Sequence, residues 1–136
     1  MKSRGLRNNN PLNIRHNEDV FQGEINGNDK RFKTFSSLPY GYRAAFVILG
    51  TYLSHGLNTI EKIITKWAPP AENDTESYID KVEKWSGVLR SKKLTAADGP
   101  EYIMIVAAMS FVENGKNADI SAVKEGFNLQ TKIKIQ

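Results

Sequence analysis

The sequence predicts a single α+β domain that is mainly helical, with one small β-hairpin and about five helices. The chain has 136 residues, which suits one domain with its own core and is short for two. Several stretches repeat apolar residues with the 3.6-residue period of a helix, and one short stretch carries hairpin-turn residues. We therefore expect one domain over residues 1–136.

The composition excludes several classes of protein. Apolar residues make up 40% and charged residues 25% of the chain, the balance of a globular protein that is neither disordered nor membrane-spanning. It has no cysteine and two histidines, so we expect no disulfide, no thiolate zinc site, no cysteine nucleophile and no other metal or cofactor site. No run approaches the roughly 20 apolar residues of a membrane helix.

Charge and the N-terminal residues bear on location and partners. The net charge of +4 is a mild basic bias, which favours anionic polymers but does not select one. No helix-turn-helix or basic-aromatic motif is present, so nucleic-acid binding is disfavoured. The first five residues lack the apolar stretch of a signal peptide. We expect synthesis in the cytoplasm and arrival at the cell wall by lysis or inside a virion.

Residues 1–18 show neither helical nor alternating periodicity and are predicted to form an ordered loop. Asn8, Asn9 and Asn10 precede Pro11, and Asn13 follows. Asparagine amides can bond their own backbone in Asx turns or bond a sugar hydroxyl. The structural and the ligand-binding interpretation both fit this segment.

A hairpin and a long helix are predicted next. Residues 20–25 and 30–35 suit short strands, and the Asn-Gly-Asn-Asp stretch at 26–29 has hairpin-turn chemistry. Ser36 or Ser37 can cap a helix that begins near Pro39, whose apolar residues keep mostly to the helical period. His55-Gly56 is expected to end this helix.

Five further segments follow. Asn58 with Glu61, and Asn73 with Glu76, resemble capping boxes that begin two helices, which end at the double proline 69–70 and at Gly87. Residues 98–100 introduce an apolar helix over 102–112, expected to be the most buried element. A last short helix is predicted near 119–126. Residues 129–136 alternate like an exposed strand or tail.

Several sequence motifs in the chain resemble those of a known family. The motifs are Arg-Asn-Asn-Asn-Pro-Leu-Asn-Ile-Arg at 7–15, Phe-Gln-Gly at 21–23, Phe-Lys-Thr-Phe at 32–35, Tyr-Gly-Tyr-Arg-Ala at 40–44, and Trp-Ala-Pro-Pro-Ala-Glu-Asn-Asp-Thr at 67–75 with Tyr78 after it. Together they resemble a family of phage and prophage proteins described as virion structural proteins. More distantly they are similar to the glucosaminidase branch of the lysozyme superfamily. The resemblance covers about residues 4–88.

The resemblance implies a lysozyme-like fold and action on bacterial cell-wall glycan, as a glycosidase or a lytic transglycosylase. In the glucosaminidase branch the acid glutamate ends a long helix before the Asn-rich turn. Here only a handful of residues precede that turn, and none is acidic. This departure supports the alternative that the chain is a catalytically silent lysozyme-like module, acting as a virion component beside other virion proteins or as a wall-binding protein.

Three carboxylates are the catalytic candidates, because glycoside cleavage needs a carboxylic acid near the scissile oxygen and a group that handles the positive charge. Glu24 lies where the branch places acidic residues on the hairpin, although an exposed strand glutamate is an equal interpretation. Asp29 can assist as a second carboxylate or serve the turn. Glu72 precedes a helix start, where backbone amides favour an ionised stabiliser.

The substrate-binding candidates are amides, aromatic residues and one cation. Phe21 can stack on a sugar face, and Arg43 can bind a carboxylate or a phosphate. Core packing, helix capping and surface ion pairs are the alternatives for this set. The predicted site is a groove between the hairpin and the helix starting near Asn73, lined by Glu24, Glu72 and Tyr78. The full set is Asn9, Asn10, Asn13, Phe21, Tyr40, Arg43, Asn73 and Tyr78.

Overall fold

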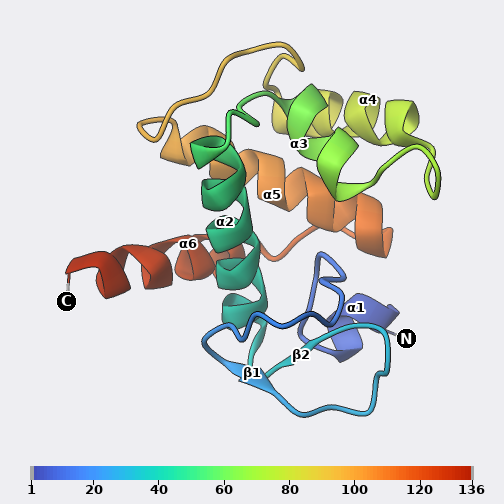
Figure 1. Cartoon of the computed structure of the whole chain (residues 1–136), viewed down its shortest axis with the longest axis vertical. Coiled ribbons are helices and arrows are strands. Elements are labelled where there is room, and N and C mark those ends of the chain that lie inside the picture. Colours follow the sequence, from blue (N-terminus) through green and yellow to red (C-terminus); the bar gives the residue numbers. More distant parts are fainter. Residues whose placement is uncertain (1, 136) are drawn as a thin grey trace.

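The computed structural model describes residues 2–135, with side chains described through Gln130. It confirms a mainly helical chain with one small antiparallel hairpin (Figure 1). Six helices and two strands occur in this part of the chain, against about five helices predicted. In order they are α1 (Arg4–Arg7), β1 (Glu24–Ile25), β2 (Thr34–Phe35), α2 (Leu38–Ser54), α3 (Ile60–Trp67), α4 (Thr75–Ser86), α5 (Gly99–Asn114) and α6 (Ile120–Ile135).

The N-terminal segment contains a helical turn that the prediction of a loop missed. Helix α1 begins after Ser3, whose hydroxyl accepts a hydrogen bond from the Leu6 backbone N–H at 3.3 Å. Past this turn Asn9 and Asn13 have positive φ angles of 51° and 53°, a conformation that asparagine tolerates better than most residues. The asparagines therefore shape a folded-back turn beside α1.

The hairpin is shorter than predicted. Strand β1 pairs with β2 in the register Glu24–Phe35 and Ile25–Thr34, so most of the predicted strand residues at 20–23 and 30–33 lie outside the ladder. The Asp29 carboxylate accepts hydrogen bonds from the backbone N–H groups of Arg31 and Phe32 at 2.9 and 3.0 Å. The connection between the strands therefore forms a wide loop over residues 26–33, which is longer than the predicted turn at 26–29.

Two of the predicted helix starts are one residue early. Thr59, not Asn58, caps α3 by accepting from the Lys62 N–H, and Asp74, not Asn73, caps α4 by accepting from the Ser77 N–H. The ends are as expected, because α3 stops before the double proline and α4 ends at Gly87, which has a positive φ of 73°. In each case a neighbouring side chain of similar capping ability occupies the position.

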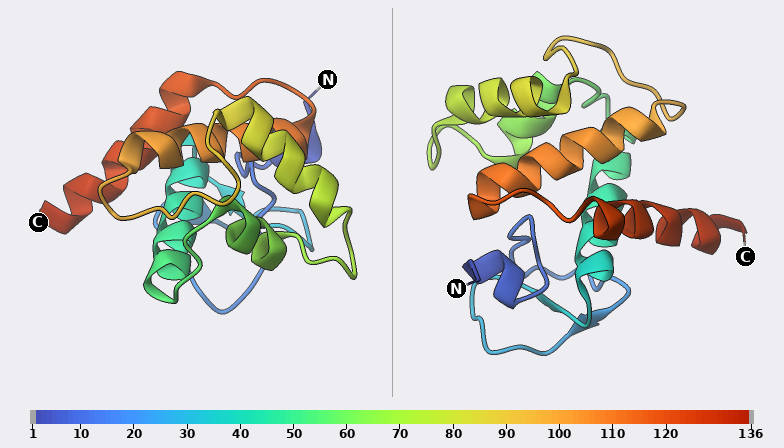
Figure 2. Two further views of the ribbon diagram at one scale, coloured as in Figure 1. Left: turned by 90° about the horizontal axis from the view of Figure 1, so that it is seen from above. Right: turned by 180° about the vertical axis from the view of Figure 1, so that it is seen from behind.

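Helix α6 corrects the prediction for the C-terminus. The helix runs through Ile135, so a strand or tail over 129–135 is wrong, and Gln136 lies outside the described residues. Its first half packs on α2, where buried Gly126 lets the two backbones approach each other: a Cβ there would lie 2.7 Å from the Cβ of Tyr42. The second half extends away from the rest of the molecule (Figure 2).

Helix α5 is the centre of the main core. Residues 105–110 of this helix are all buried, as expected for the most apolar segment, and they contact α2, α4 and α6. A smaller apolar cluster of Ile14, Phe35 and Ala44 joins the hairpin to α2, and Trp67 packs against both clusters. Trp67 therefore lies at the junction between the helical part and the N-terminal part.

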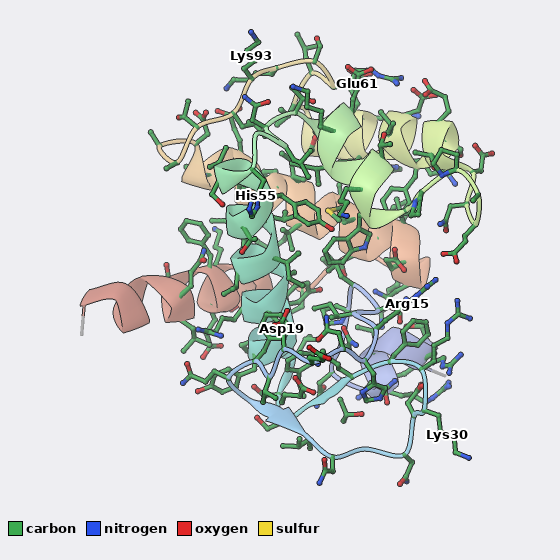
Figure 3. All side chains as sticks on the ribbon, viewed as in Figure 1. Arg15, Asp19, Lys30, His55, Glu61 and Lys93 are labelled. Atoms are coloured by element: carbon green, nitrogen blue, oxygen red, sulfur yellow. The ribbon has the colours of Figure 1, made fainter. Side chains whose placement is uncertain are left out.

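Charged side chains cover the outside of both parts. Arg15, Asp19 and Lys30 lie on the part that carries the hairpin, whereas Glu61 and Lys93 lie at the other end (Figure 3). Within residues 2–135 no helix is both long and apolar enough to cross a membrane.

Candidate functional site

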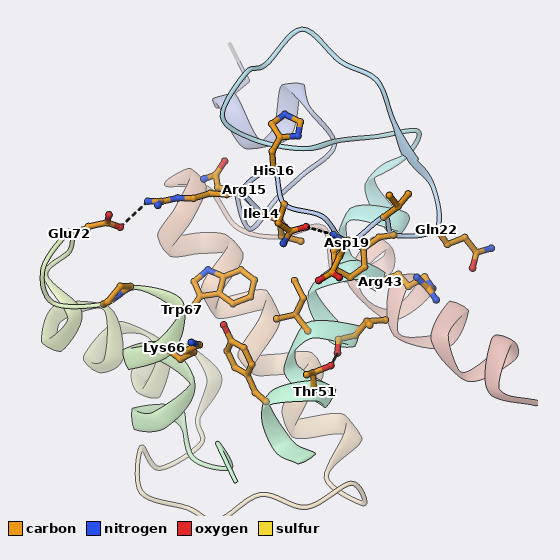
Figure 4. Close-up of a pocket in the computed structure, with 18 residues that line it drawn as sticks. Ile14, Arg15, His16, Asp19, Gln22, Arg43, Thr51, Lys66, Trp67 and Glu72 are labelled. Atoms are coloured by element: carbon orange, nitrogen blue, oxygen red, sulfur yellow. Dashed lines mark hydrogen bonds and ion pairs between the residues drawn. The ribbon is translucent and has the colours of Figure 1, made fainter. Parts of the chain in front are cut away.

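A cleft with a volume of about 890 Å³ separates the N-terminal loop from helices α2 and α3 (Figure 4). One wall is the loop over residues 13–22, the second is the exposed face of α2, and the third is the end of α3 with the turn after it. Its lining is mixed: Asn13, Ile14, Arg15, His16, Asn17, Asp19, Val20, Phe21, Gln22, Arg43, Val47, Ile48, Thr51, Tyr52, Lys66, Trp67, Pro69 and Glu72.

Aromatic rings form part of this lining. Tyr52 on α2 and Trp67 on α3 meet edge to face with ring centroids 6.3 Å apart, and Phe21 lines the cleft from the loop side. Tyr52 and Trp67 both pack against the main core, which limits their movement. Rings presented in this way suit the apolar face of a ring-shaped ligand such as a pyranose.

An ion pair closes one end of the cleft. Arg15 from the loop and Glu72 from the turn after α3 approach to 3.1 Å, and both side chains are about half exposed, at 53% and 54%. An exposed pair of this kind adds little to stability. It joins two walls of the cleft that no backbone ladder connects.

Arg43 lies toward the other end of the cleft (Figure 4). Its Nε atom is buried and has no hydrogen-bond partner in the described part of the chain. Burial lowers the pKa of this guanidinium from its ordinary value, because the charged form loses hydration without a protein carboxylate in compensation. The site therefore contains a cation whose buried Nε–H is not used by the fold.

The most unusual carboxylate adjoins the cleft and was not predicted. Glu113, in the last turn of α5, is partly buried, and it accepts hydrogen bonds from Asn13 Nδ2 and from the Tyr78 hydroxyl, both at 2.8 Å. Burial raises the pKa of its carboxyl, and these two bonds partly oppose the rise. Asn13 also lines the cleft, so one side chain separates Glu113 from the open space.

The raised pKa of Glu113 has a consequence for stability. The unfolded-state pKa of a glutamate is about 4.3. When the folded-state pKa is higher, the extra stability is fully present below the unfolded-state pKa, and it is lost as the pH rises through the folded-state pKa. Glu113→Gln removes the titration. We therefore expect the Tm of the native chain to fall relative to that of Glu113→Gln as the pH rises above about 4.3. Parallel thermal melts by circular dichroism test this; a constant Tm difference would contradict it.

Four of the predicted site residues line the cleft, namely Asn13, Phe21, Arg43 and Glu72. Tyr78 is buried and is outside the lining, and its hydroxyl donates a hydrogen bond to Glu113. The predicted groove was to be lined by Glu24, Glu72 and Tyr78, and of these only Glu72 is in the described lining.

Two of the predicted carboxylates form ion pairs within the protein. Both Glu24 oxygens accept hydrogen bonds at 3.0 Å from the Nζ of Lys33, which is 1% exposed. Asp29 pairs with Arg4 at 2.7 Å and accepts from the Asn8 amide at 2.9 Å. The hydrogen bond from Arg4 is the largest cause that lowers the pKa of Asp29 far below its usual range.

The other predicted residues bond or pack within the protein. Asn9 Nδ2 donates to the Phe35 carbonyl at 3.1 Å, Asn73 Nδ2 donates to the Pro69 carbonyl at 3.3 Å, and Asn10 is fully buried with bonds to three backbone groups. Tyr40 packs against Gly23, where a Cβ would lie 2.3 Å from its ring. No cluster of metal-binding side chains occurs among residues that the structure describes.

Comparison with known proteins gives the family. No protein-family model matches the sequence. Protein P5 of Pseudoalteromonas phage PM2 is 42% identical over 131 residues, and the alignment covers 92% of this chain and 80% of that protein. Identity at this level over nearly the whole chain indicates common descent. The chain therefore belongs to the family of Protein P5 of phage PM2 and is a homologue of a phage protein.

Proposed function

We propose that this phage-protein homologue acts on peptidoglycan through a lysozyme-like cleft, as a glycosidase or a lytic transglycosylase, with Glu113 as the proton donor. The observation that carries the proposal is the environment of Glu113. Its partly buried carboxyl is held between Asn13 and Tyr78, beside a large cleft with aromatic walls. Its raised pKa is what a general acid at neutral pH requires.

The position of Glu113 supports the proposal. The resemblance to the glucosaminidase branch calls for an acid at the end of a long helix beside an Asn-rich turn. Helix α5 is such a helix, and Glu113 in its last turn contacts Asn13 of that turn. The helix follows the turn in the chain instead of preceding it. Tyr78, part of the motif that the resemblance singled out, donates to the same carboxylate.

The rest of the cleft supplies the remaining requirements. Phe21 and Trp67 would stack on sugar rings, and Asn13 would orient both the acid and the glycan. Glu72, on the rim, would stabilise positive charge as an ionised carboxylate once its bond to Arg15 opens. Glu24 and Asp29 would support the hairpin instead of touching the glycan, because their oxygens are engaged by Lys33 and Arg4.

The alternative is a catalytically silent module that binds wall glycan or other virion proteins. A specific observation favours it: each Glu113 oxygen already accepts a hydrogen bond from the protein, and Glu72 is ion-paired. In this case the same cleft would bind a glycan strand without cutting it.

Release of soluble fragments from purified peptidoglycan separates the two functions. We expect the native chain to release fragments and Glu113→Gln to be slower by at least about 100-fold, close to 2.7 kcal/mol of barrier. Glu125→Gln is the matched control, because Glu125 is exposed on α6, and it should be unchanged. Binding without cleavage by the native chain would establish the silent module. Cleavage that Glu113→Gln leaves intact would overturn the proton-donor assignment.

A further inference from the structure

The charges that line the cleft are unevenly distributed. Arg15, Arg43 and Lys66 are positive, whereas Asp19 and Glu72 are negative. Arg15 and Glu72 neutralise each other at one end through their ion pair. Arg43 forms no ion pair with Asp19 or with any other residue in the described part of the chain. Outside the pair of Arg15 and Glu72, Arg43 and Lys66 face a single carboxylate, Asp19, so the lining carries an excess of one positive charge.

Arg43 is held in place by its surroundings. It is in the first half of α2 and is partly buried, and its backbone is in close contact with Gly126 of α6. Its neighbours along the helix, Tyr42 and Ala44, are fully buried. A guanidinium on such a rigid base, with a buried and unpartnered Nε–H, loses little freedom when a ligand binds it.

The chemistry of a free guanidinium selects the ligand group. Its planar array of N–H donors matches the two oxygens of a carboxylate, and the match is strongest where water is partly excluded. Burial disfavours the charged guanidinium of Arg43, so a bound anion would remove a cost that the folded protein carries. A neutral sugar hydroxyl would remove less of this cost.

We infer that the Arg43 part of the cleft is an anion-binding subsite that takes a carboxylate carried by the glycan. The inference rests on the proposed function and refines it: the cleft selects the acidic strand of peptidoglycan over a neutral strand of the same backbone. Two groups on that strand have the required chemistry. One is the lactyl carboxylate of a muramic-acid sugar without peptide, and the other is a carboxylate of the stem peptide.

Titration calorimetry with three tetrasaccharide probes tests the subsite. The first probe is a chitin tetrasaccharide, which is neutral. The second is a tetrasaccharide of alternating N-acetylglucosamine and N-acetylmuramic acid without peptide. The third is the same alternating tetrasaccharide carrying its stem peptides. Working in the Glu113→Gln background keeps the strands intact. We expect at least one acidic probe to bind at least 10-fold more tightly than the neutral probe. Tighter binding of the peptide-free acidic probe identifies the lactyl carboxylate as the bound group. Tighter binding of the probe that carries stem peptides identifies a carboxylate of the stem peptide.

Adding Arg43→Gln to the Glu113→Gln background should abolish the preference for an acidic probe over the neutral one. The affinity for the chitin tetrasaccharide should change less than 2-fold, and this retained affinity shows that the variant is folded. Arg7→Gln is the matched control, since it removes the same charge from an exposed position outside the cleft. Equal binding of all three probes, unaffected by Arg43→Gln, would overturn the subsite and leave the glycan cleft standing. Failure of every probe to bind would overturn both proposals.

Discussion

Asn10→Asp is expected to destabilise the fold by about 4 kcal/mol, because it leaves two buried carbonyls without donors and buries a charge. Asn10 is 0% exposed. Its Nδ2 donates to the carbonyls of Ile14 and Lys33 at 2.9 and 2.8 Å, and its Oδ1 accepts from the Ile14 N–H at 2.9 Å. An aspartate keeps the shape and the acceptor but places a second oxygen against both carbonyls.

Urea unfolding followed by circular dichroism measures this loss. Asn128→Asp is the control, since Asn128 is exposed on α6, and a surface change of this kind should stay within about 0.5 kcal/mol. If Asn10→Asp cost less than about 1 kcal/mol, the amide would not be the link between the N-terminal turn and the hairpin.

Gly41→Ala is expected to cost about 3 kcal/mol, as a methyl group forced into a packed backbone contact. A Cβ at this position would lie 2.0 Å from the Asn9 carbonyl oxygen and 2.7 Å from Cδ of Pro11. Neither group can move easily, because Pro11 is rigid and Asn9 is fixed by its bond to Phe35. Helix α2 would have to shift away from the Asn-rich turn.

A control on the same helix is expected to change the free energy of unfolding in the opposite direction. Gly50 has no atom within 4 Å of its virtual Cβ, so Gly50→Ala should stabilise α2 by up to about 1 kcal/mol through helix propensity alone. Both variants are compared by the same urea titration. A Gly41→Ala protein as stable as Gly50→Ala would show that α2 and the turn are not in the close contact described.

Local chemistry was sufficient to predict most helices. Pro39, the double proline after Trp67, Gly87 and the Asp98-Gly99-Pro100 stretch act within a few residues of their own position, so their effects could be read directly. The start of α4 was placed one residue early because Asn73 and Asp74 are both good caps, and only the hydrogen bond to Ser77 decides between them. The C-terminal alternation over 129–135 favoured a strand, but the helix that Gly126 docks on α2 continues through it.

The site depends on contacts that no local pattern reveals. Glu113 is one acidic residue near the end of an apolar helix, and the sequence contains no signal that Asn13 and Tyr78 would meet it. Its residue type favours a surface position instead, because glutamate is mostly exposed in folded proteins. Glu24 was a candidate because its pairing with the buried Lys33 is a tertiary contact, and a lysine in a sequence is normally expected at the surface.

The contact between Asn13 and Glu113 spans 100 positions along the chain, and a second bond, from Ser3 to Asn114 at 2.6 Å, spans 111. During translation the asparagine turn leaves the ribosome long before the glutamate has been made. A nascent chain that lacks α5 therefore has no complete site, and whatever chemistry belongs to this region is withheld until α5 has been synthesised.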